Sequence, residues 1–253
     1  MVSWNCDSSR PDSLNGEPQN FNFLNEALHS VDSPPDIIVF GFQEVIDLES
    51  RKMVAKNVLL GGKKKTDDGL SEKVTGAYKR WHDRLVLAVR AAMPKDVVYC
   101  VAHTESLIGL FSCIFVKNTE RPSFDDVSIT TIKRGMGGRY GNKVWFNFLV
   151  IQHNYLSPNH KQGGIVARFV VGDSSICFIN CHLAAGQNAV RQRNADVAGM
   201  LEEKAVFSPT IDHGMAYIGG GDGTMVLDHE FVVVNLCFCP FFLMLWSLTL
   251  IYS

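Results

Sequence analysis

Residues 176–187 read ICFINCHLAAGQ, an apolar run that stops at a histidine and then opens into small residues and a glycine. The β-branched and aromatic residues before the histidine favour a strand, because such side chains fit a pleated, half-buried surface. Gly186 permits a turn that other residues resist, and an amphipathic run follows from Asn188. His182 is therefore expected where a buried strand reaches the surface.

This position gives His182 two interpretations. A strand end is rigid and aims an imidazole at solvent, which suits a catalytic group. A lone histidine at a strand end is more often simply hydrogen-bonded there. The residue by itself leaves both interpretations open.

A second apolar run ends on a carboxylate. Residues 36–45 read DIIVFGFQEV, so Glu44 closes a predicted buried strand. An unpaired carboxylate there would be costly, so we expect Glu44 in a salt bridge or bound to a metal ion. Mg²⁺ takes oxygen ligands and keeps several waters, so one or two carboxylates suffice for it.

Hydrophobic periodicity predicts further helices and strands, with two successive strands that form a hairpin and make the sheet partly antiparallel. Such an order is typical of an α+β layering rather than of a simple doubly wound sheet. The predicted helices are 21–30, 78–92 and 188–204, and the predicted strands are 97–102, 107–116, 127–132, 163–171 and 225–235.

Composition predicts one α/β domain in this chain of 253 residues. The 24 basic and 26 acidic residues give a net charge of −2, so no overall positive field attracts nucleic acid. The seven cysteines show no C-x-x-C pair and are expected to be buried thiols of a reducing compartment. We expect no signal peptide, because Met1 and Val2 lead almost directly into polar sequence.

Residues 133–143 read KRGMGGRYGNK and combine four glycines with four cations. Such a loop can bring backbone N–H groups and cationic side chains close to phosphate oxygens. A flexible surface turn is the alternative interpretation of the same residues.

These motifs together resemble the inositol polyphosphate 5-phosphatases, a branch of the endonuclease/exonuclease/phosphatase superfamily, and within it the synaptojanin-type proteins. The segment Asn180-Cys181-His182 with its following L-A-A-G is similar to the signature N-x-H-L-A-A-G. Trp4-Asn5 is similar to W-N-x-N or W-N-x-D, and Gln43-Glu44 to the Q-E motif. Residues 133–143 resemble K-x-G-M-G-G…G-N-K.

The resemblance implies a DNase I-like fold, a four-layer sandwich of two mixed β-sheets flanked by helices and incomplete at the C-terminus. It implies Mg²⁺ as cofactor, held by Glu44 and Asn5. It assigns catalytic roles to His182 and Asn5, and substrate binding to Lys143 and Asn142.

The sequence departs from the family pattern at residues 144–162. The family continues after Gly-Asn-Lys with glycine and a strand, and removal of 144–162 would restore that order at Gly163. Valine codons begin with GT and a glutamine codon can end in AG, so we hypothesise an unspliced intron translated in frame. A spliced transcript that still encodes these residues would refute the hypothesis.

A second departure follows Asn235. The family motifs G-D-x-N-Y-R and P-x-W-x-S/C-D-R are absent, and the chain continues as LCFCPFF. Residues 231–252 carry no charge and are long enough to span a bilayer, which allows a tail anchor. We favour a translated intron that begins after Val234-Asn235 over this anchor, because a valine codon begins with GT. We therefore divide the chain into a partial catalytic domain, 1–235, and an apolar tail of uncertain status, 236–253.

The expected function is Mg²⁺-dependent hydrolysis of a 5-phosphate in phosphoinositide lipids or soluble inositol polyphosphates, impaired by the missing motifs. The expected location is cytoplasmic and peripheral at membrane surfaces, without nucleic acid as a partner. The alternatives are a non-catalytic fragment that binds phosphoinositides or membranes, and a nuclease of the same superfamily. The oligomeric state is not predicted by these residues.

Overall fold

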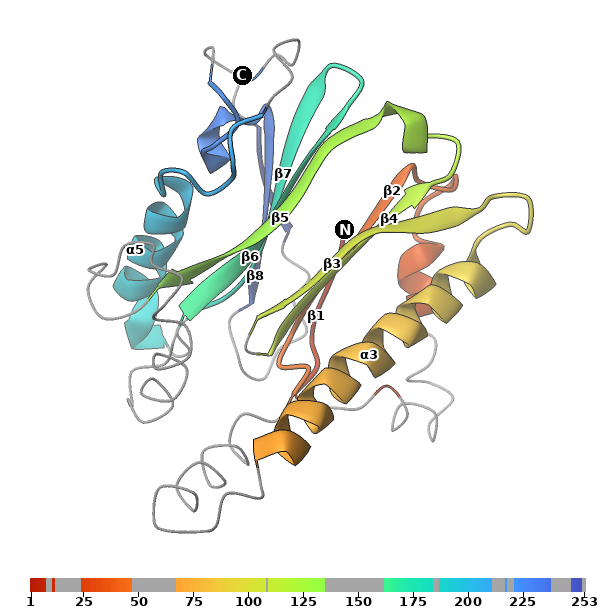
Figure 1. The fold of residues 1–253 in the computed structure, drawn as a ribbon, viewed down its shortest axis with the longest axis horizontal. Helices are drawn as coiled ribbons and strands as arrows, with labels where there is room; N and C mark the ends of the chain where they lie inside the picture. The colour runs from red at the N-terminus through yellow and green to blue at the C-terminus, as the bar shows by residue number, and fades with distance from the viewer. Residues whose placement is uncertain are drawn as a thin grey trace.

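The computed structural model describes residues 1–7, 11, 24–46, 67–107, 109–134, 162–183, 187–210, 217, 221–237 and 247–251. Their strands form two mixed sheets, which lie face to face between helices (Figure 1). The predicted DNase I-like sandwich is confirmed. The order of its layers is helix α5, one sheet, the other sheet and helix α3 (Figure 1).

The first sheet has the strand order β1-β2-β4-β3. Its strands are β1 Val2–Asn5, β2 Ile37–Gln43, β3 Tyr99–Leu107 and β4 Leu110–Lys117. Strand β1 runs parallel to β2, whereas β2, β4 and β3 pair antiparallel. The hairpin of β3 and β4 confirms the predicted antiparallel part of the sheet, although its second strand begins at Leu110 and not at Leu107.

The second sheet has the strand order β5-β6-β7-β8-β9. Its strands are β5 Phe124–Arg134, β6 Gln162–Val171, β7 Ser174–His182, β8 Phe231–Cys237 and β9 Ser247–Ile251. Only β7 and β8 are parallel. Strand β6 begins at the last residue of the predicted insert 144–162, and the rest of that insert lies outside the described residues.

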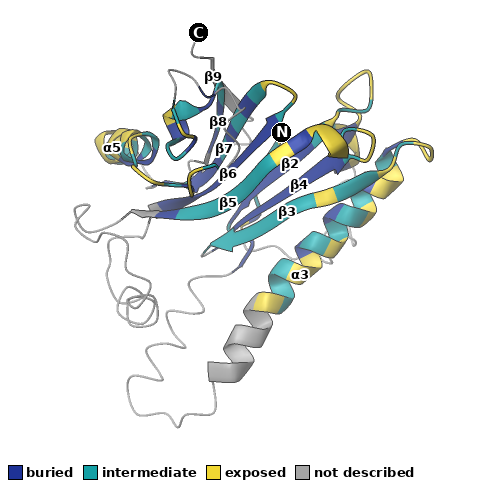
Figure 2. Cartoon of the chain, turned by 45° about the horizontal axis from the view of Figure 1, so that its top comes forward, coloured by how far each residue is buried: buried dark blue, intermediate teal, exposed yellow. Residues whose placement is uncertain are grey.

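Helix α3 (Asp67–Ala92) covers the outer face of the first sheet (Figures 1 and 2). Its buried residues Trp81, Leu85 and Val89 recur every four positions and pack on a core that includes Phe40 and Phe42 of β2. The Trp81 ring meets the Phe42 ring edge-on at 5.3 Å between centroids, an arrangement that aromatic quadrupoles favour. The predicted core-packing helix is thereby confirmed.

Helix α5 (Val190–Leu201) covers the outer face of the second sheet, within the range predicted as helical. It contributes Met200 to a core that also contains Cys177, Ile179 and Cys181 of β7. Because side chains alternate along a strand, the other face of β7 points at the first sheet. Burial raises the pKa of the Cys177 thiol, which keeps it protonated.

The layer between the sheets is apolar at one end and polar at the other. Val39 and Ile114 of the first sheet pack there with Phe169 of β6. Alternation along β2 places Gly41 and Gln43 in the same layer, towards the end of the strand. Alternation along β7 places Asn180 and His182 there in the same way.

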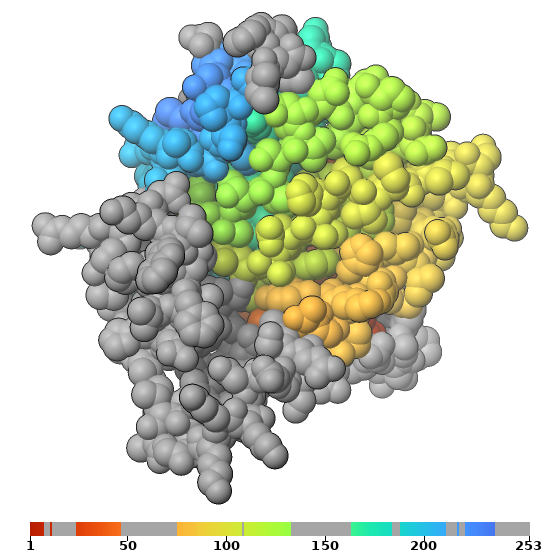
Figure 3. All heavy atoms as spheres, viewed as in Figure 1, coloured from red at the N-terminus to blue at the C-terminus, as the bar shows by residue number. Residues whose placement is uncertain are grey.

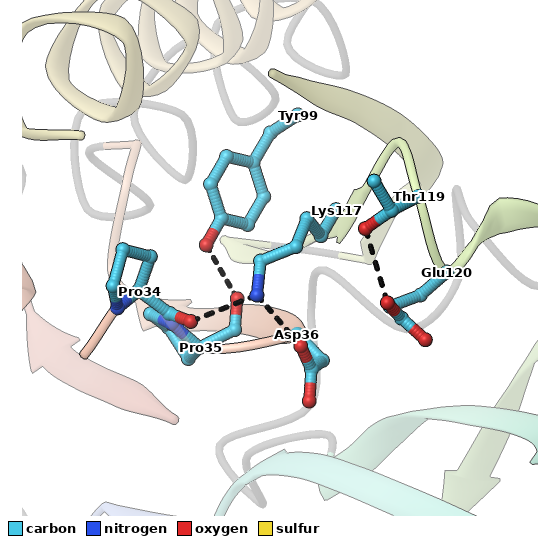
Figure 4. Close-up of polar contacts among 7 residues, drawn as sticks. All are labelled: Pro34, Pro35, Asp36, Tyr99, Lys117, Thr119 and Glu120. Atoms are coloured by element: carbon cyan, nitrogen blue, oxygen red, sulfur yellow. Dashed lines mark hydrogen bonds and ion pairs between the residues drawn. The ribbon is translucent and has the colours of Figure 1, made fainter. Parts of the chain in front are cut away.

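The opposite end of the first sheet is fixed by Lys117, the last residue of β4 (Figure 4). Its ammonium group donates to the carbonyl of Pro34 at 3.1 Å and to a carboxylate oxygen of Asp36 at 2.8 Å. The Tyr99 hydroxyl donates to the neighbouring carbonyl of Pro35. These bonds hold the segment that leads into β2, and so fix where this strand begins.

A buried ionic cluster attaches the segment before β8 to the second sheet. The Arg168 guanidinium on β6 donates to Asp126 at 2.8 Å and to the carbonyl of Gly223, and lies 4.9 Å from the centre of the Phe207 ring. The Tyr217 hydroxyl donates to the other oxygen of Asp126. Arg168 is 3% exposed, so these partners compensate the free-energy cost of burying its charge.

His229 lies beside this cluster, with its ring against Phe207 and Tyr217. Its Nδ1 lies 3.0 Å from the carbonyl of Val226, and no partner for its buried Nε2 is present among the described residues. Burial lowers the pKa of the His229 imidazole. The ring is therefore held neutral.

The described beginning of the apolar C-terminal run is a strand of the second sheet. Its first residues, 231–237, form strand β8, which is paired on both sides by β7 and β9. None of the helices in the described part of the chain combines the length and apolar character that a bilayer crossing requires. Within β8, Val232, Val234 and Asn235 are buried, which accounts for the absence of charge at these positions.

Candidate functional site

Three strand ends from the two sheets meet at one place. Asn5 is the last residue of β1, and its parallel pairing with Gln43 brings the ends of β1 and β2 to the same edge. Glu44 follows directly after β2. His182 is the last residue of β7 in the second sheet. The two sheets therefore both contribute to this edge of the sandwich.

The side chains of Asn5 and His182 both contact one carboxylate oxygen of Glu44. The Asn5 amide Nδ2 donates to Glu44 Oε1 at 3.0 Å, and His182 Nε2 lies 3.2 Å from the same oxygen. The Asn5 Oδ1 accepts the backbone N–H of Asp7 at 3.0 Å, which fixes which way the amide faces. We call Asn5, Glu44 and His182 the strand-end triad.

Glu44 has a strained backbone. Its φ of 51° lies in the left-handed region, where a residue with a Cβ costs about 1–3 kcal/mol. Hydrogen bonds on either side hold this conformation: the Cys6 N–H donates to the Gln43 carbonyl at 2.8 Å, and the Val45 N–H to the Gly109 carbonyl at 3.0 Å. Strain that the surroundings maintain in this way is frequent at functional sites, where it directs a side chain.

The triad is accessible from one side. The side chain of His182 is 27% exposed and that of Glu44 is 20% exposed, whereas Gln43 directly behind them is fully buried. Solvent and a small ligand can therefore reach the carboxylate and the imidazole. Away from this edge, the surface over α3, β3 and β5 is continuous in the space-filling view (Figure 3).

The donor set suits a hard divalent cation. Glu44 supplies a carboxylate and Asn5 an amide oxygen, and Mg²⁺ or Ca²⁺ binds such oxygens. No group of three or more His, Cys, Asp or Glu side chains that could hold a metal occurs within the described ranges. A cation at this edge would therefore retain most of its ligands as water or as oxygens of a bound phosphate, as Mg²⁺ commonly does.

The predicted site residues divide into two groups. The structure brings Asn5, Glu44 and His182 together, and what each of them does stays a prediction. The predicted substrate-binding residues Asn142 and Lys143 lie outside the described residues.

Three buried amides behind the triad were not predicted. Gln43, Asn180 and Asn235 are almost completely buried and hydrogen-bond to one another between the sheets. Their sequence signal is a polar residue inside an apolar strand, on the side that faces the other sheet. The motifs include Gln43 and Asn180, but they do not show that the amides meet.

Residues 2–235 match the sequence model of a family described as Endonuclease/Exonuclease/phosphatase family 2. The chain belongs to this family. It is 34% identical over 237 residues to a probable inositol polyphosphate 5-phosphatase of Schizosaccharomyces pombe, a match that covers 93% of this chain and 18% of the relative. The predicted resemblance to inositol polyphosphate 5-phosphatases is confirmed.

Synaptojanins are further relatives in this family. The chain is 27% identical over 168 residues to synaptojanin of Caenorhabditis elegans, covering 66% of this chain and 11% of the relative. It is 30% identical over 164 residues to human synaptojanin-2, covering 65% and 8%. The chain thus spans between 8% and 18% of the length of these three curated relatives.

A solved structure has the same fold. It is the inositol polyphosphate 5-phosphatase domain of SPsynaptojanin, determined in complex with inositol (1,4)-bisphosphate and a calcium ion. The TM-score is 0.54 at 21% identity, and the match covers 93% of this chain and 50% of that one. This agreement supports the arrangement of the two sheets.

Proposed function

We propose that residues 1–235 form the cation- and phosphate-binding part of an inositol polyphosphate 5-phosphatase site. The observation that carries the proposal is the strand-end triad. The first sheet supplies the oxygen ligands of Asn5 and Glu44, and the second sheet supplies the His182 imidazole within hydrogen-bonding distance of Glu44. The relative at 34% identity is named for this activity, and the solved relative holds an inositol bisphosphate and a divalent ion. The proposed substrates are phosphoinositide lipids or soluble inositol polyphosphates.

Glu44 and Asn5 would hold the cation, with Mg²⁺ as the proposed ion. A bound divalent cation supplies positive charge that polarises a phosphoryl oxygen. His182, next to Glu44, would donate a hydrogen bond to a phosphoryl oxygen as negative charge develops on it. Lys143 and Asn142, in the glycine-rich stretch, would contact the neighbouring phosphates of the ring.

Turnover also requires a group that orients and deprotonates the attacking water. In the family pattern an aspartate of the G-D-x-N-Y-R motif has this role, and in this sequence Asn235 is followed by LCFCPFF in place of that motif. A general base typically contributes about 10²- to 10⁴-fold in rate. We therefore propose that this chain hydrolyses its substrate slowly, and that binding without efficient turnover is its second candidate function.

The long β5–β6 connection includes the proposed insert. Strands β5 and β6 are antiparallel neighbours, with Arg134 opposite Gln162, so the two strand ends that residues 135–161 connect along the chain are adjacent. Loop length at such a place has a small effect on stability, because closure entropy grows slowly with length. Deletion of residues 144–162 removes Gln162, the first residue of β6, and should leave the pairs from Gly163 to Val171 in place. The transcript decides whether the natural protein has these residues.

The proposed location is the cytoplasmic face of membranes, reached through lipid headgroups. Vesicles with and without a phosphoinositide, otherwise of the same composition, would test this in a co-sedimentation assay. Binding that depends on the phosphoinositide supports the proposal. Equal binding to both vesicles, lost after removal of residues 236–253, would instead support an apolar membrane contact.

The deciding experiment measures phosphate release and binding together. Wild type and Glu44→Gln are compared with inositol 1,4,5-trisphosphate in the presence and absence of Mg²⁺, with calorimetry for binding. We expect Mg²⁺-dependent binding and slow phosphate release in the wild type, both lost in Glu44→Gln. Nicking of plasmid DNA without phosphate release would favour a nuclease, and equal behaviour of the two proteins would refute the assigned site.

A further inference from the structure

The side chains of Gln43, Asn180 and Asn235 form one hydrogen-bonded unit between the two sheets, which we call the amide cluster. Asn180 Oδ1 accepts from Gln43 Nε2 at 2.7 Å and from Asn235 Nδ2 at 3.0 Å. The three residues are 0%, 3% and 1% exposed, in sequence order. Buried amides in this number require such partners, because an unpaired polar group in a protein interior costs about 1–3 kcal/mol.

Asn180 links its own strand to both inner strands of the opposite sheet. Its Nδ2 lies 3.3 Å from the carbonyl oxygen of Phe42 on β2. It lies 3.1 Å from both the carbonyl oxygen of Phe111 and the hydroxyl of Ser112 on β4. One side chain of β7 thus fixes the position of that strand over β2 and β4.

Asn235 makes a second link between the sheets. Its Nδ2 also donates to the carbonyl of Gly41 at 2.9 Å, and its Oδ1 accepts from the Ser3 hydroxyl at 2.5 Å. A Cβ on Gly41 would meet Asn235 Nδ2 at 2.6 Å, so only glycine allows this approach. Strand β8 is thereby tied to β1 and β2.

Each strand that delivers a member of the strand-end triad is also bonded to the amide cluster. Ser3 precedes Asn5 by two residues, Gln43 directly precedes Glu44, and Asn180 precedes His182 by two residues. Residues two apart in a strand share a face, so Ser3 and Asn180 lie directly behind the site residues of their strands. A slip of one sheet by a single residue, about 3.3 Å, would break the whole set of bonds.

We propose that Gln43, Asn180 and Asn235 are positioning residues that hold the ends of β1, β2 and β7 at fixed separations and thereby set the affinity of the strand-end triad, through Glu44 and Asn5, for a divalent cation. The inference rests on the proposed function, because it takes the strand-end triad as the cation site. It adds to that function a group of residues that touch neither cation nor substrate. Their effect reaches the site through strand ends that are each one or two residues away.

The test uses Gln43→Met, which keeps the length of the side chain and removes its hydrogen bond to Asn180. Ser175→Ala is the matched control. Ser175 is also buried, and its hydroxyl accepts the Glu230 N–H at 3.0 Å, so it joins β7 to the start of β8 at the opposite end of the strand. Ser3→Ala, which removes only the bond from β1 to Asn235, is a milder variant that tests the cluster if Gln43→Met does not fold.

Mg²⁺ alone is titrated into each protein, followed by calorimetry and by the NMR shifts of the His182 ring, and urea unfolding reports stability. Loss of a group that is hydrogen-bonded to a metal ligand typically weakens metal affinity about 10- to 100-fold. Gln43 acts through the backbone of its neighbour Glu44, so the lower end of this range applies. We expect a loss in this range for Gln43→Met, a smaller loss for Ser3→Ala and unchanged affinity for Ser175→Ala. A structural role alone would lower stability in all three variants and leave the affinity of the folded protein unchanged.

Two results would overturn the inference while the proposed function stands. Wild type and a folded cluster variant could bind Mg²⁺ equally well, or Ser175→Ala could lose as much affinity as Gln43→Met. If Mg²⁺ does not bind to the wild type or perturb the His182 ring, the proposed function fails, and the inference fails with it.

Discussion

Replacement of Arg168 by methionine is expected to destabilise the protein by about 3–5 kcal/mol. Loss of one partner of a buried ion pair typically costs about 3–5 kcal/mol, because the other charge stays buried without its counter-charge. The side chain of Asp126 is 15% exposed and also accepts the Tyr217 hydroxyl, so the lower end of that range applies. The contact between the buried Arg168 guanidinium and the Phe207 ring adds about 1–2 kcal/mol.

The second variant of this experiment is Asp126→Asn, and the third combines the two changes. The double variant buries neither charge, so it should be more stable than the sum of the single effects predicts, by about 1–3 kcal/mol. Urea unfolding followed by tryptophan fluorescence and by circular dichroism gives the four free energies of unfolding. Additive effects, within about 0.5 kcal/mol, would refute the ion pair as the source of the loss.

Three further predictions concern His229, Gly41 and Glu44. Burial lowers the pKa of His229 in the folded protein, so the unfolded chain binds more protons below about pH 6.5. The free energy of unfolding should therefore fall as pH decreases, by at most about 1.4 kcal/mol per pH unit. Urea unfolding of the wild type and of His229→Gln at pH 8 and pH 5.5 should show a smaller fall in the variant. Gly41→Ala should lower the free energy of unfolding by about 1–3 kcal/mol, because its new methyl group would meet Asn235 Nδ2 at 2.6 Å. An unchanged urea midpoint would contradict this close approach of Gly41 and Asn235. Mg²⁺ at ten times its dissociation constant should stabilise the wild type by about 1.4 kcal/mol and leave the stability of Glu44→Gln unchanged. Thermal unfolding with and without Mg²⁺ measures this difference, and equal shifts in melting temperature for the two proteins would mean that the ion binds elsewhere.

The sequence predicts which residues end a strand better than it predicts which side chains meet between the two sheets. Glu44 and His182 each close an apolar run, so their exposure at a strand end follows from local pattern. The meeting of Gln43 with Asn180 does not follow from it, because the partner across the gap depends on how one sheet lies over the other. Alternation shows which face a side chain takes and leaves its opposite neighbour undetermined.

Local errors have local causes. The predicted strand 107–116 begins instead at Leu110, because Gly109 takes a φ of 87° that only glycine adopts readily and the chain turns there. The uncharged run 231–252 suggested a possible membrane segment, whereas its first part is the interior strand β8. Composition does not separate these cases, since a strand covered on both faces is as apolar as a membrane span.

The parallel pairing of β1 with β2, and the bond from Ser3 to Asn235, give the protein a particular order of assembly. During translation Asn5 leaves the ribosome well before its neighbour His182 and before Asn235, which supports the strand that carries Asn5. A nascent chain that contains only the first sheet would therefore have no formed triad. Acquisition of the metal would coincide with docking of the two sheets, and the ion would select the completed sandwich over its folding intermediates.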